Sequence, residues 1–140
     1  MAIKKQEFYE GAALHLLART SEITSIRYEA PFFLLNNQLL VYLKYSTKSR
    51  SPWGFTFTTE EQVLLQNRAS EFKIVIGLIC GSDGVAAFTY DAYRSVAAPR
   101  KSAVRIACYR QYGEHYEVNG PDGKLEKKVA PSNWQKILER

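Results

Sequence analysis

The residues best suited to chemistry lie on one predicted strand and in the loop after it. Residues 39–45 are apolar apart from Lys44, and lysine is rarely buried without a partner. A hydroxyl-rich loop at 46–53 then carries two basic residues and ends in an aromatic one. Basic and hydroxyl side chains commonly contact phosphates, and tryptophan can stack on a base. The pattern predicts DNA or RNA as partner, bound by Lys44, Lys48, Arg50 and Trp53.

The same side chains have structural interpretations that the sequence leaves open. Lys44 could lie on an edge strand, or its stem could cross the sheet so that the amine reaches water. The loop with Lys48 and Arg50 could simply be solvated, and Trp53, at the start of an alternating strand, is better interpreted as a core anchor. Glu10 is a further catalytic candidate, although its place on a predicted helix favours a solvent-facing role.

Hydrophobic periodicity and turn residues predict the elements that position these side chains. Helices are expected at about 4–19, 59–70 and 89–96, with a last short one from Ser132, and strands at 25–30, 32–35, 39–45, 53–57, 72–80, 85–89, 104–109, 116–118 and 125–129. Thr58 and Thr59 each precede an acid or amide by three residues, which is a capping-box signature.

This order predicts an α+β fold, or α/β, with a mixed central sheet flanked by helices and a β-rich C-terminal extension. We expect a single domain over residues 1–140, with a core at about 4–96 and a tail at about 103–140.

Composition limits the classes of partner and compartment. The net charge of +5 favours a polyanion. Cys80 and Cys108 lie in apolar strand-like runs, which predicts buried reduced thiols, and the two cysteines and two histidines show no zinc spacing. No apolar run is long enough to span a membrane, and residues 1–7 lack the apolar segment of a signal peptide, so we expect a cytoplasmic protein without membrane contacts.

The segment at about 4–96 resembles a small member of the PD-(D/E)XK nuclease superfamily, the fold of many restriction endonucleases and Holliday-junction resolvases. Pro31-Phe32 stands where that family has Pro-Asp, and Tyr42-Leu43-Lys44 stands where it has Glu-x-Lys. Glu10 lies on the preceding helix, as an acidic residue does in the family. The resemblance implies a restriction-endonuclease-like sheet and a site that holds nucleic acid.

Phe32 and Tyr42 replace the two carboxylates that hold magnesium in that family, and they cannot ligate it in the same way. The resemblance therefore implies a degenerate site with no metal or cofactor, in a nucleic-acid-associated protein that is not an enzyme.

Two alternatives remain. The first is a protein-binding accessory or inhibitory module, with a protein partner or a second copy, supported by Tyr109, Tyr112 and Tyr116 because tyrosine is enriched in interfaces. The second is a magnesium-dependent nuclease with carboxylates relocated to Glu10, Glu29 and Asp83.

Overall fold

A computed structural model describes residues 2–20 and 22–139 and shows an α+β fold. Its elements are α1 (Lys5–Ala18), β1 (Ile26–Glu29), β2 (Phe32–Leu35), β3 (Leu39–Ser46), β4 (Trp53–Phe57), α2 (Thr59–Ala69), β5 (Lys73–Cys80), β6 (Gly84–Thr89), α3 (Tyr90–Val96), β7 (Val104–Tyr109), β8 (Glu117–Gly120), β9 (Gly123–Lys124) and the 3-10 helix η1 (Pro131–Lys136).

The first sheet is mixed and has the strand order β1-β2-β3-β5-β6. Strands β1 to β3 form an antiparallel meander, and β3 then pairs in parallel with β5 from Leu39↔Lys73 to Ser46↔Cys80. Strand β6 closes this sheet antiparallel to β5. Strand β5 is buried at every position after Lys73, as expected for a strand covered on both faces.

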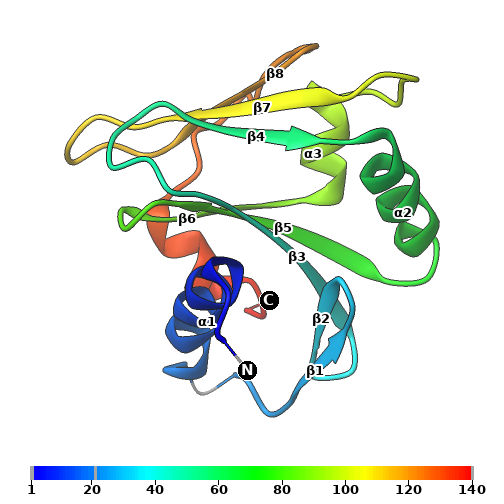
Figure 1. Cartoon of the computed structure of the whole chain (residues 1–140), viewed down its shortest axis with the longest axis vertical. Helices are drawn as coiled ribbons and strands as arrows, with labels where there is room; N and C mark the ends of the chain where they lie inside the picture. The colour runs from blue at the N-terminus through cyan, green and yellow to red at the C-terminus, as the bar shows by residue number, and fades with distance from the viewer. Residues whose placement is uncertain (1, 21, 140) are drawn as a thin grey trace.

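The second sheet has the order β4-β7-β8-β9 and is antiparallel throughout. Figure 1 shows it along one side of the molecule, with α2 and α3 at one end of the space between the two sheets. Helix α1 and η1 lie on the opposite face of the first sheet. Strand β4 precedes residue 96 and β7 follows residue 103, so the predicted core and the predicted tail share this sheet.

Two hydrophobic clusters hold these layers together. One fills the space between the sheets and includes Phe57 of β4, Leu65 of α2 and Tyr93 of α3. The other joins α1 and η1 to the far face of the first sheet. In this cluster the fully buried Trp134 donates its indole N–H to the carbonyl oxygen of Ala13 at 2.9 Å, which ties the C-terminal segment to the first helix.

Most of the predicted elements are confirmed within one to three residues, including the capping box at Thr58 and the short helix capped by Thr89. The predicted strand at 125–129 is wrong, because pairing in that region is limited to β9 and an isolated bridge between Tyr116 and Val129. The last short helix is η1, and Ser132 does not cap it.

Cys80 and Cys108 are buried free thiols, one in each sheet. Within the described residues, no helix combines the length and the apolar character needed to cross a bilayer.

Candidate functional site

A cleft opens where β3 runs past the end of its neighbour β2. Pairing between the two strands stops at Val41, so residues 42–46 have no strand partner on that side within the described parts of the chain. The cleft holds about 400 Å³. Its walls come from α1, from this free stretch of β3, from β4 and from α2, through Gln6, Tyr42, Leu43, Lys44, Tyr45, Gly54, Phe55, Thr56 and Glu61.

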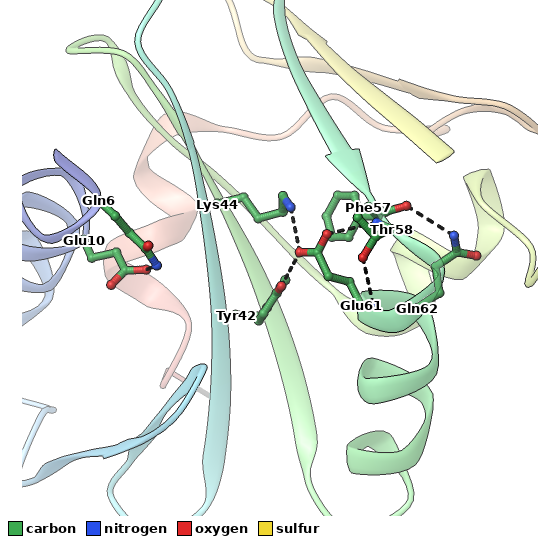
Figure 2. A network of polar contacts seen from close by, with 8 residues as sticks. All are labelled: Gln6, Glu10, Tyr42, Lys44, Phe57, Thr58, Glu61 and Gln62. Carbon is green, nitrogen blue, oxygen red and sulfur yellow. Dashed lines mark hydrogen bonds and ion pairs between the residues drawn. The ribbon is translucent and has the colours of Figure 1, made fainter. Parts of the chain in front are cut away.

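Glu61 organises the polar side of the cleft (Figure 2). Its Oε2 atom accepts a hydrogen bond from Lys44 Nζ at 2.6 Å and another from the Tyr42 hydroxyl. Its Oε1 atom accepts from the backbone N–H of Thr58 at 2.9 Å, which completes the capping box of α2. Lys44 Nζ also lies 4.9 Å from the ring centroid of Phe57. Lys44 is therefore held by a carboxylate and an aromatic ring, a pairing that neither interpretation from the sequence anticipated.

These contacts keep Glu61 ionised and Tyr42 protonated. Burial would raise the pKa of Glu61, but the hydrogen bonds from Lys44, Tyr42 and Thr58 outweigh it, and the pKa lies below its ordinary value. Burial and the hydrogen bond to Glu61 raise the pKa of Tyr42. The side chains of Lys44 and Glu61 are each 19% exposed, so their attraction is screened less than that of a surface pair.

The structure does not bring together the carboxylates suggested for a relocated metal site. Glu29 is paired with Arg27 at 2.5 Å and with Arg68 at 3.2 Å. Asp83 is paired with Arg110 at 2.8 Å and accepts from the Tyr116 hydroxyl at 2.6 Å. Within residues 2–20 and 22–139, no three His, Cys, Asp or Glu side chains are arranged to hold a metal ion.

Glu10 lies on α1, on the other side of β3 from Glu61 (Figure 2). It is half-buried, and its carboxylate accepts from the Gln6 side-chain amide at 2.9 Å. Burial raises the pKa of Glu10 above its ordinary value. Glu10 is therefore neither fully exposed, as a helix position alone suggests, nor in contact with Lys44, Tyr42 or Glu61.

The loop between β3 and β4 is fixed by backbone contacts, while Lys48 and Arg50 are exposed. Trp53 is 2% exposed and donates its indole N–H to the Lys48 carbonyl at 2.9 Å, which confirms it as a core anchor and leaves no free face for a base. The Ser51 hydroxyl accepts from the Arg110 backbone N–H at 3.0 Å, which places the loop against the end of β7.

Positive charge is concentrated around the pairing of β4 with β7. Residues 45–59 and 92–113 contain seven basic residues and no acidic one. These are Lys48, Arg50, Arg94, Arg100, Lys101, Arg105 and Arg110. Because the whole chain is only +5, the remaining segments carry a slight negative excess. We call β4, β7 and the adjoining loops at 46–52 and 97–103 the basic ribbon.

Four cations of the basic ribbon are exposed and have no ion-pair partner among the residues that the structure describes: Lys48, Arg50, Lys101 and Arg105. Arg105 lies flat across Gly54 on the neighbouring strand. A Cβ atom at Gly54 would be 1.9 Å from Arg105 Nη2, so only glycine permits this approach. Gly54 also lines the cleft, so Arg105 connects the basic ribbon to it.

Sequence reasoning identified Lys44, Lys48 and Arg50, missed Glu61, and did not connect Arg105 with the other three. A signal for Glu61 was present, because the capping box fixes its side chain at the start of α2. Arg105 reaches the site only through the pairing Thr56↔Arg105, between strands far apart in the chain. No local pattern reports such a pairing.

Replacing Glu61 by glutamine should destabilise the fold in a pH-dependent manner. The pKa of Glu61 in the folded state lies below its ordinary value of 4.5. The ionised carboxylate therefore stabilises the fold fully above pH 4.5, and this stabilisation is lost as the pH falls through the folded-state pKa. We expect Glu61→Gln to lower the free energy of unfolding by about 1–3 kcal/mol at pH 7. Urea titrations between pH 7 and pH 3 should show this difference shrinking below about pH 4.

The matched control is Glu60→Gln, which changes an exposed glutamate in the same first turn of α2. It should shift stability by less than about 0.5 kcal/mol. A pH-independent loss in Glu61→Gln would contradict the assignment of the carboxylate as the ionised partner of Lys44.

Replacing Gly81 by alanine should destabilise the loop at 46–52. Gly81 has φ +55°, and a Cβ atom there would lie 2.2 Å from the Lys48 carbonyl oxygen. We expect a loss of about 1–3 kcal/mol in the free energy of unfolding, together with faster amide exchange in the loop at 46–52. Gly113→Ala is the control, because φ is +80° but nothing lies within 4 Å of the added atom. Equal losses in the two variants would show that the contact with Lys48 contributes nothing.

Comparison with known proteins found no family model that matches the chain, no match among curated proteins and no match among solved structures. The functional argument for this chain therefore rests on its own geometry: a cleft organised by Glu61 and a basic ribbon beside it.

Proposed function

We propose that this protein binds nucleic acid and holds its phosphate groups through the basic ribbon. The observation that carries this proposal is the concentration of positive charge: two segments without a single acidic residue pair as β4 and β7, while the rest of the chain is slightly negative. Phosphate neutralisation by lysine and arginine supplies most of the affinity of such binding. Exposed cations on a fixed backbone suit this role because less ordering is needed on binding.

The phosphate contacts are assigned to Lys48, Arg50 and Arg105. Lys44 is bonded to Glu61, and a phosphate that used the same amine would have to compete with that carboxylate. Lys44 therefore supports the wall of the cleft in this proposal. The contact of Arg105 with Gly54 extends the row of cations from the loop along the strands to the cleft.

The nuclease resemblance is part of the proposal, as a relation of architecture. Its support is the order of elements: a helix, three antiparallel strands, the strand β4 of the second sheet, a helix, and a strand parallel to the third. The proposal is one of binding without cleavage, since Glu29 and Asp83 are engaged with arginines and Phe32 and Tyr42 occupy the family's carboxylate positions.

A second candidate function is protein binding, favoured by an exposed apolar surface at α1 and β1. Phe8 is 64% exposed and Tyr28 is 61% exposed. A groove of about 630 Å³ lies between these elements, lined in part by Leu14 and Phe33. Sedimentation velocity on the wild type and on Phe8→Ser tests this candidate. A self-associating species that Phe8→Ser converts to monomer would support it, and a monomer in both would remove a second copy as the partner.

The double variant Lys48→Ala/Arg50→Ala tests the main proposal. Each lost phosphate contact should reduce the slope of log K against log salt by about 0.7 to 0.9, so the slope should fall by about 1.5. Fluorescence anisotropy with labelled DNA and RNA between about 25 and 200 mM salt, where the Debye length falls from about 20 to about 7 Å, gives this slope directly. Affinity at low salt should fall in the same variant.

The control double variant is Lys5→Ala/Arg19→Ala, which removes the exposed lysine at the start of α1 and the exposed arginine at its C-cap. It changes the net charge by the same amount, away from the basic ribbon. An equal loss of slope in both variants would show a diffuse charge effect and not a site, and no binding by the wild type at low salt would refute the proposal.

A further inference from the structure

The outer face of the second sheet combines an exposed aromatic ring with the cations of the basic ribbon. Side chains alternate along β7, so that Val104, Ile106 and Cys108 are buried while Arg105 and Tyr109 are exposed. On β4, Gly54 and Thr56 share the outer face. Figure 1 shows no helix on this side of the sheet, and α2 and α3 lie on its inner side. Thr56, Arg105 and Tyr109 are the exposed positions of this face on the two strands.

Tyr109 lies between two groups of cations. Arg105 is four residues before it on the same face of β7. On the other side, Arg110 donates its backbone N–H to Ser51, which brings the loop of Lys48 and Arg50 next to the end of the strand. Tyr109 is 40% exposed, and its hydroxyl has no hydrogen-bond partner among the described residues. The ring is thus free to contact a ligand.

The positions beside Tyr109 on this face carry a small side chain and a cation. Ala107 lies two residues before it, and the Arg105 guanidinium lies across Gly54, the cross-strand partner of Ala107. The Glu117 carboxylate lies across from Tyr109 and is 3.8 Å from Lys124. An aromatic ring with cations on both sides along the strand suits a base whose backbone follows the strands.

We infer that the outer face of the second sheet binds single-stranded nucleic acid, with an unpaired base stacked on Tyr109 and phosphates on Arg105, Lys48 and Arg50. The inference rests on the proposed function and names its substrate class. A duplex presents its bases already stacked on one another, so none of them is free to stack on Tyr109. Stacking on an aromatic ring needs a base that is out of the helix, which a single strand supplies without an energetic cost of unpairing.

The test uses the full chain with two variants of the same residue. Tyr109→Ala removes the ring, and Tyr109→Phe keeps it, so a loss specific to Tyr109→Ala reports stacking. Tyr28→Ala is the matched control, because it removes an exposed tyrosine from β1 of the other sheet. The probes are a fluorescent oligothymidine, an oligouridine and a mixed-sequence DNA duplex, and circular dichroism melts confirm that each variant is folded.

We expect the wild type to bind oligothymidine or oligouridine more tightly than the duplex. Tyr109→Ala should weaken single-strand binding by about 5- to 150-fold with little change in the salt slope, because the ring carries no charge. Tyr109→Phe and Tyr28→Ala should bind like the wild type.

Two outcomes would overturn the inference and leave the proposed function intact: a wild type that prefers the duplex, or a Tyr109→Ala variant whose single-strand affinity and salt slope match the wild type. The absence of salt-sensitive binding to any of the three probes would overturn both.

Discussion

The parallel pairing of β3 with β5 is the constraint on which the rest of the structure depends. Two consecutive strands of a parallel pair cannot be joined by a tight turn, so the chain must cross over from one end of the sheet to the other. Here the crossover runs from residue 47 to residue 72 and contains both β4 and α2. Every feature of the candidate site follows from what this crossover carries.

The crossover places Glu61 next to Lys44 and provides β4 as the strand with which β7 pairs. Strand β4 runs back from the end of β3, and α2 follows it directly, so that Glu61 in the first turn of α2 contacts Tyr42 and Lys44 (Figure 1). Strand β7 pairs with β4 along its whole length. The first strand of the second sheet is therefore part of the crossover. The inner faces of the two sheets bury one shared cluster, so neither sheet is a separate unit.

Local signals account for what the sequence predicted, and their absence accounts for what it did not. The elements around Lys44 were predictable because turns and caps mark their ends, as Thr58 does for α2. The partner of Lys44 was not, because it depends on how the crossover folds back. The overpredicted strand at 125–129 was expected because it follows a turn at 119–123, but it has only an isolated bridge at Val129, since β8 and β9 pair for just two residues each. A turn predicts that the chain reverses direction, and the length of the pairing depends on contacts that the turn does not report.

The internal pairing of Lys44 explains why the positive charge available to a ligand lies outside the cleft. At the position where the nuclease-like pattern places a lysine, this chain neutralises the amine with Glu61 and covers it with Phe57. Removing either charge alone would leave its partner half-buried and unpaired, so the two are expected to persist together. An acidic ligand approaching the cleft then meets Glu61 close to Lys44 and little net attraction. On the basic ribbon the same ligand meets exposed cations, and the segments 45–59 and 92–113 that supply them contain no carboxylate. The electrostatics of the chain thus favour the open face of the second sheet over the cleft as the place where a polyanion binds.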